Sequence, residues 1–93
     1  MATRYKERIE TYCTQRGIAI PPGFRRHPAS RYAAIDMGAQ PPRLIATTWF
    51  KIEDLAYYVL HSGAGRTLKL LDFKDDIELR MDAGGRLERV GPA

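Results

Sequence analysis

The sequence predicts one α+β domain in which an antiparallel sheet packs against two helices. The chain has 93 residues, which is near the lower end of the range for a single domain. A segment with helical spacing of apolar residues, 51–62, lies between groups of segments in which apolar and polar residues alternate. We therefore expect the order α-β-β-α-β-β-β over residues 1–93, with flexible ends at about 1–3 and 91–93.

The first predicted helix covers residues 3–16. Its apolar residues share one face: Tyr5, Ile9, Tyr12 and Cys13. Gly17 ends it. We expect this face to pack on the sheet, and the alternative is a partner-binding face. Residues 18–30 contain three prolines and are expected to be irregular.

The second predicted helix, 51–62, follows a strand directly. Its apolar residues have the spacing i, i+3, i+4, i+7: Ile52, Leu55, Ala56 and Val59. Tyr58 and Leu60 widen this stripe. The carboxylates of Glu53 and Asp54 lie in the first turn, where they interact favourably with the positive end of the helix dipole. We expect Gly63 to close the helix in the left-handed conformation.

Five segments have the composition of strands: 31–37, 43–50, 67–73, 77–82 and 86–90. Residues 77–82 have the clearest alternation, with Ile77, Leu79 and Met81 inward. Both faces of 43–50 are partly apolar, so we expect this segment to be a central strand covered by helix. Residues 86–90 read as a short edge strand, whose charges discourage further pairing.

The net charge of +4 is unevenly distributed. Residues 1–46 carry eight Lys and Arg against three Asp and Glu, whereas residues 47–93 carry seven against eight. A basic half favours an acidic partner such as nucleic acid. However, 11 of the 15 basic residues are arginine, which is also what the base composition of a gene produces. Both interpretations stay open.

No pattern typical of catalysis is present, so we expect a protein that is not an enzyme. Two histidines and one cysteine, scattered along the chain, match no nucleophile motif and no zinc-ligand spacing. The acidic residues from 72 to 82 do not follow an EF-hand, and we expect a solvated acidic turn there. We therefore predict no catalytic residues, no metal and no cofactor.

A basic, aromatic loop is the main argument for nucleic-acid binding. The residues that would contact nucleic acid or another acidic partner are Phe24, Arg25, Arg26, His27 and Arg31. Arginine binds phosphate through two nitrogens, and aromatic rings stack on bases. The structural alternative is that these arginines pair with Asp36 or with the acidic turn at 72–76.

Aromatic residues around the second helix are the argument for a protein partner. Trp49, Tyr57 and Tyr58 lie close in sequence, and a helix has only one buried stripe. Exposed aromatic residues beside charges are typical anchors of interfaces. We therefore expect a small, non-catalytic protein-binding or regulatory domain, with nucleic-acid binding as the alternative.

The sequence also leads to expectations about oligomeric state and cellular location. We expect a monomer or a homodimer and no contact with membranes. The lone Cys13 forms no internal disulfide, and the sequence has neither a signal peptide nor an apolar run of membrane-spanning length. These features predict a cytoplasmic protein.

Overall fold

The described residues form two helices and five strands in the predicted order. The computed structural model describes residues 5–24, 29–48, 51–63 and 65–93. The elements are α1 (Lys6–Gln15), β1 (Tyr32–Asp36), β2 (Arg43–Thr48), α2 (Ile52–Ser62), β3 (Leu68–Asp72), β4 (Ile77–Met81) and β5 (Leu87–Pro92). The order α-β-β-α-β-β-β and the α+β class are thus confirmed. Since β5 extends to Pro92, residues 91 and 92 belong to the sheet.

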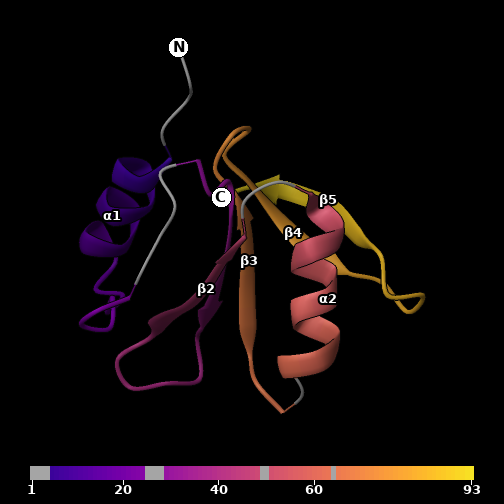
Figure 1. The fold of residues 1–93 in the computed structure, drawn as a ribbon, viewed down its shortest axis with the longest axis horizontal. Coiled ribbons are helices and arrows are strands. Elements are labelled where there is room, and N and C mark those ends of the chain that lie inside the picture. Colours follow the sequence, from indigo (N-terminus) through magenta and orange to yellow (C-terminus); the bar gives the residue numbers. More distant parts are fainter. Residues whose placement is uncertain (1–4, 25–28, 49–50, 64) are drawn as a thin grey trace.

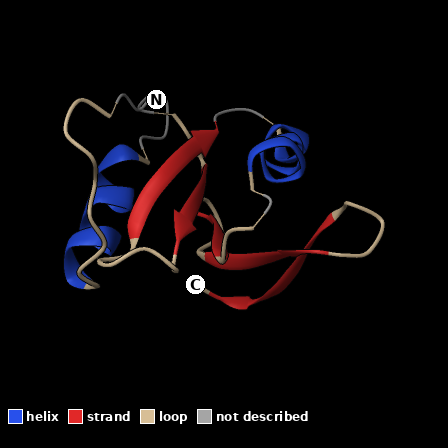
Figure 2. Cartoon of the chain, turned by 90° about the horizontal axis from the view of Figure 1, so that it is seen from below, coloured by secondary structure: helices blue, strands red, loops and turns tan. Residues whose placement is uncertain are grey.

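The five strands form one antiparallel sheet in the order β2-β1-β3-β4-β5. Figure 1 shows the sheet between the two helices. In the view of Figure 2, α1 and α2 lie on opposite sides of the sheet. Each helix therefore covers a separate face, and the protein has two cores rather than one.

Strand β1 is the centre of this arrangement because both of its faces are buried. Ala33 and Ile35 belong to the core under α1. Tyr32 and Ala34 belong to the core under α2. Successive side chains of a strand point to opposite faces, so four consecutive apolar residues supply both cores.

Strand β2 lies at an edge of the sheet, so the expectation of a central strand at 43–50 was wrong. Its only strand neighbour among the described residues is β1. The first part of its outer edge is paired with the segment after α1: Ala19 N–H donates to the Pro42 carbonyl at 2.7 Å, and Leu44 N–H donates to the Ala19 carbonyl at 2.9 Å. The partly apolar composition of β2 has two causes. The segment after α1 covers its outer edge, and its two faces contribute to the two cores, because an edge strand here still lies between two helices.

The core under α1 uses the predicted helical stripe. Tyr5, Ile9, Tyr12 and Cys13 are all buried, and they pack with Ile35, Leu44, Leu71 and Phe73 of the sheet. The ring of Tyr12 meets that of Phe73 edge to face, with 5.5 Å between centroids. This face of α1 packs against the sheet, which confirms the expectation that it covers the sheet.

The core under α2 is narrower than the predicted stripe. Leu55 is fully buried, and Ile52, Tyr58 and Val59 are half-buried against Leu70 and Leu79. Leu60 does not widen this stripe, since 57% of it is exposed. Its methyl groups lie instead beside Gly85, in the turn between β4 and β5.

Gly63 ends α2, but not through the left-handed conformation that we expected. Its φ is −93°. A Cβ at this position would lie 2.7 Å from the Val59 carbonyl oxygen and 2.9 Å from Leu68 Cδ1. Glycine is therefore needed because the chain passes too close to its neighbours for any side chain.

Neither α1 nor α2 combines the length with the apolar character that crossing a membrane requires; this holds for the part of the chain that the structure describes.

Two leucines on α2 give a matched test of this packing. We expect Leu55→Ala to lower the free energy of unfolding by about 2–4 kcal/mol, because it opens a cavity in a closed core. Leu60→Ala should change it by less than about 0.5 kcal/mol, because that side chain is mostly in water. Urea unfolding followed by circular dichroism measures both, and equal losses would contradict the assignment of the buried face.

Candidate functional site

The outer face of α2 carries exposed apolar residues that the fold does not use. Tyr57 is 66% exposed and Leu60 is 57% exposed. Three residues apart on a helix, they lie on the same side. His61, four residues after Tyr57, is also exposed, and its ring contacts that of Tyr57 at a tilt of 35° with 4.1 Å between centroids. We call Glu53, Asp54, Tyr57, Leu60 and His61 the α2 face.

The acidic end of the α2 face forms no ion pair within the part of the chain that the structure describes, although Arg86 lines the same groove as Glu53. Glu53 and Asp54 lie in the first turn and are exposed. Neither forms an ion pair with any residue in the described ranges. The residue before the helix, Lys51, provides no side-chain cap. The two carboxylates therefore lie at the positive end of the helix dipole.

A groove lies beside this face, between α2 and the turn that joins β4 to β5. It has a volume of about 310 Å³, and its apolar lining comes from Ile52, Ala56, Gly85 and Leu87. Ile52, Ala56 and Leu60 are spaced by four residues, so they form one row along the helix. The exposed Leu60 thus continues the apolar lining of the groove toward the C-terminal end of α2.

The three residues predicted to bind a protein partner do not share one environment. Tyr57 is the most exposed large apolar residue of the described chain. Tyr58 is half-buried and packs on the core under α2. Trp49 lies outside the described residues. Leu60, which the sequence interpretation assigned to the buried stripe, joins Tyr57 and His61 on the exposed side.

The residues predicted to contact nucleic acid also do not share one environment. Phe24 is half-buried against the core under α1. Arg25, Arg26 and His27 lie outside the described residues. Arg31 is described, and it is engaged in a part-buried ion pair.

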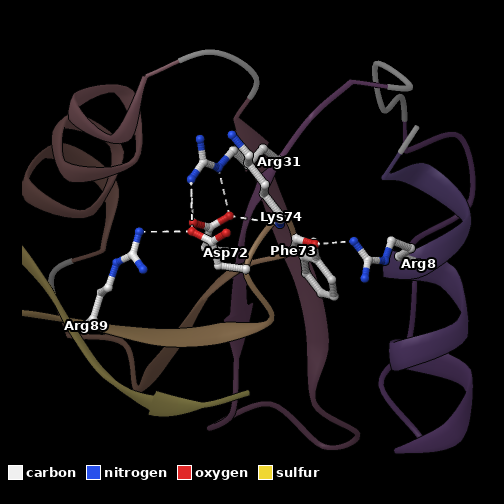
Figure 3. A network of polar contacts seen from close by, with 7 residues as sticks. Arg8, Arg31, Asp72, Phe73, Lys74 and Arg89 are labelled. Atoms are coloured by element: carbon white, nitrogen blue, oxygen red, sulfur yellow. Dashed lines mark hydrogen bonds and ion pairs between the residues drawn. The ribbon is translucent and has the colours of Figure 1, made fainter. Parts of the chain in front are cut away.

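Arg31 precedes β1 and binds Asp72, the last residue of β3, through two parallel hydrogen bonds (Figure 3). Arg31 Nε donates to Asp72 Oδ1 at 2.8 Å, and an Nη nitrogen donates to Oδ2 at 2.8 Å. The backbone N–H of Lys74 donates to Oδ1 at 3.0 Å. The Asp72 side chain is 3% exposed and that of Arg31 is 24% exposed. This geometry leaves Arg31 poorly placed to bind a phosphate.

The ionisation of this pair follows from its surroundings. Burial alone would raise the pKa of Asp72, because it penalises the charged carboxylate. The hydrogen bonds from Arg31 and from the Lys74 backbone outweigh burial and hold the pKa of Asp72 below its ordinary value. The hydrogen bond with Asp72 in turn raises the pKa of Arg31, so that Arg31 stays charged. Burial also raises the pKa of Tyr32, whose ring lies 4.9 Å from the Arg31 guanidinium.

The acidic turn after β3 is paired with arginines, rather than simply solvated as we expected. Asp75 accepts a hydrogen bond from Arg89 of β5 at 2.9 Å and lies 3.6 Å from Arg31. Asp76 accepts one from Arg8 of α1 at 2.9 Å. Arg8 also donates to the Phe73 carbonyl at 2.7 Å. In Figure 3 the arginines converge on this turn from three parts of the chain.

The described groups that carry chemistry are far apart. Cys13 is fully buried in the core under α1, whereas His61 is exposed on α2, on the other side of the sheet. Within the described ranges, no three His, Cys, Asp or Glu side chains are grouped as metal ligands would be. A second groove, of about 460 Å³, runs between α1 and the β3–β4 turn, and both acidic and basic side chains line it.

Comparisons with known proteins identify no relative: no family model, no curated protein and no solved structure matches this chain. The functional assignment therefore depends on the geometry alone.

Removing Arg31 should expose the structural role of the ion pair. We expect Arg31→Ala to lower the free energy of unfolding by about 2–4 kcal/mol, because it leaves the Asp72 carboxylate buried without its partner. Arg80→Ala is the matched control, since Arg80 and its partner Glu88 are both exposed, and it should cost less than about 0.5 kcal/mol. If chemical unfolding gives the same stability for both variants, the Arg31 pair is not structural.

Acid should remove the contribution of Asp72 in a defined direction. Its pKa is lowered on folding, so the stabilisation is fully present above about pH 4, the ordinary value for aspartate, and is lost as the pH falls through the lowered pKa. Asp72→Asn lacks this contribution at every pH. We therefore expect the stabilities of the wild type and Asp72→Asn, measured by urea unfolding, to differ at pH 7 and to converge below about pH 4. A difference that grows in acid would contradict the assignment.

Proposed function

We propose that this protein is a non-catalytic binding domain that recognises a protein partner through the α2 face. The observation that carries this proposal is the exposure of Tyr57 and Leu60 on the same side of a helix whose other side is packed. Burying a large apolar side chain stabilises a complex by about 1.5–3 kcal/mol, so two such residues in water are a source of binding energy. The fold itself makes little use of either.

The ring contact between Tyr57 and His61 supports the same proposal. A ring held against its neighbour has already lost part of its rotational freedom. Ordering an interface side chain costs about 0.5–1.5 kcal/mol, and a pre-ordered side chain avoids part of that cost. Tyr57 is therefore the aromatic residue on the α2 face that is best placed to act as an anchor.

Nucleic-acid binding is less well supported by the described residues. Arg8 and Arg31 are both engaged with carboxylates of the turn after β3. An arginine in such a pair must break it before it binds phosphate, so neither adds to a free positive surface. The protein-partner interpretation therefore stands first.

Crosslinking in cells tests the proposal. A photo-reactive benzoylphenylalanine at position 57 should form a covalent adduct with a protein partner, because this position lies at the centre of the α2 face. The same group at Thr14, which is exposed on α1, is the matched control and should not form that adduct. Nuclease treatment before analysis should leave the adduct unchanged.

The contact is then measured with purified proteins. Tyr57→Ala should weaken binding of the crosslinked partner by about 30-fold, as expected for an anchor that contributes about 2 kcal/mol. Thr14→Ala should leave the affinity unchanged. The proposal fails if the adduct forms equally from position 14, if it disappears with nuclease, or if Tyr57→Ala binds as tightly as the wild type.

A further inference from the structure

The charges on the α2 face are arranged in a self-complementary way. Carboxylates lie at its start, an aromatic ring at its centre, and an imidazole at its end. Glu53 and Asp54 precede His61 by seven or eight residues, which is roughly 11–12 Å along a helix that rises 1.5 Å per residue. Tyr57 lies near the middle of this span.

We infer that the α2 face binds a second copy of this chain, forming a two-fold symmetric dimer in which the two α2 helices pack antiparallel. Such an axis passes close to Tyr57. It places Glu53 and Asp54 of each copy opposite His61 of the other, and it brings the two Tyr57 rings together at the centre. This inference rests on the proposed function, because it names the partner of the same face.

The helix dipoles favour the same arrangement. In an antiparallel pair, the positive start of each helix lies beside the negative end of the other. An imidazole opposite carboxylates donates a hydrogen bond when neutral and adds an ion pair when protonated. Both contacts occur twice, once on each side of the axis, as in any isologous interface.

Charge complementarity points to a second copy rather than to a strongly basic or acidic partner. A partner of one sign would match only one end of the α2 face, whereas an inverted copy matches both. Most of the excess positive charge belongs to the half of the sequence without α2, since residues 1–46 carry a net charge of +5 and residues 47–93 carry −1. Near α2, Lys51 directly precedes the helix and Arg86 lines the adjacent groove. The overall charge therefore does not concentrate repulsion at this interface.

The interface is small. Each copy contributes the exposed side of one helix of 11 residues. The surface that this buries is less than the value of about 800 Å² per partner in a typical stable complex. We expect a concentration-dependent dimer with a dissociation constant on the order of 10–100 µM.

Sedimentation equilibrium of the purified protein tests this inference. The weight-average mass of the wild type should rise from nearer 10.6 kDa toward twice that value as the concentration increases from about 5 µM to about 500 µM, a range chosen around the expected dissociation constant. Replacing both Tyr57 and Leu60 by alanine should weaken the dimer by 10-fold or more, a loss of about 1.4 kcal/mol. Glu7→Lys, an exposed charge reversal on α1, is the control and should have no effect.

Exchanging the charges at the two ends of the α2 face tests whether the carboxylates of one copy contact His61 of the other. Glu53→Lys with Asp54→Lys should weaken the dimer, and His61→Glu alone should also weaken it. All three changes together should restore it, because the charges again alternate across the axis. Circular dichroism confirms that each variant is folded before it is compared.

The outcomes distinguish this inference from the proposed function. A wild type that stays monomeric up to about 500 µM, well above the expected dissociation constant, overturns the dimer, as does a triple variant no better than its parents. If position 57 then crosslinks to a different protein, the α2 face still binds a partner and only its identity was wrong. If position 57 crosslinks to nothing and the chain is monomeric, both proposals fall.

Discussion

The part-buried pair between Arg31 and Asp72 is the contact on which the arrangement of the sheet and α1 depends. It joins the residue that enters β1 to the residue that ends β3, and these strands are the centre of the sheet. The turn that follows Asp72 receives Arg8 from α1 and Arg89 from β5. One helix, the central strands and the far edge of the sheet are therefore held to the same short turn by charge-assisted hydrogen bonds.

This constraint changes the meaning of the basic first half of the chain. An excess of arginine suggests a surface for an acidic ligand, but arginines held by carboxylates of the same chain contribute to folding instead. Arg8 and Arg31 are both of this kind. The α2 face differs because its large apolar residues are mostly exposed and its carboxylates form no ion pair within the described residues. It is therefore the surface on which an account of function is built.

The sequence predicts the positions of the helices and strands better than it predicts how they pack together. Helix and strand positions follow from apolar spacing, and the burial of Ile9 or Leu55 follows from it directly. The strand order does not, since the composition of β2 is the same whether its cover comes from a strand or from the segment at Ala19. The partner of Arg31 lies 41 residues away, so charge pattern alone indicates an acidic turn without selecting the arginine. Leu60 leaves the stripe because the turn at Gly85, rather than the sheet, faces it.

The most direct test is the titration of the Asp72 carboxyl carbon by nuclear magnetic resonance. The account predicts a midpoint below the ordinary value of about 3.9 for aspartate, because the Arg31 and Lys74 hydrogen bonds outweigh burial. In Arg31→Ala the midpoint should rise, since burial then acts without its counterweight. A wild-type midpoint at or above about 3.9 would contradict the account, because it would mean that the carboxylate is not held by Arg31 in solution.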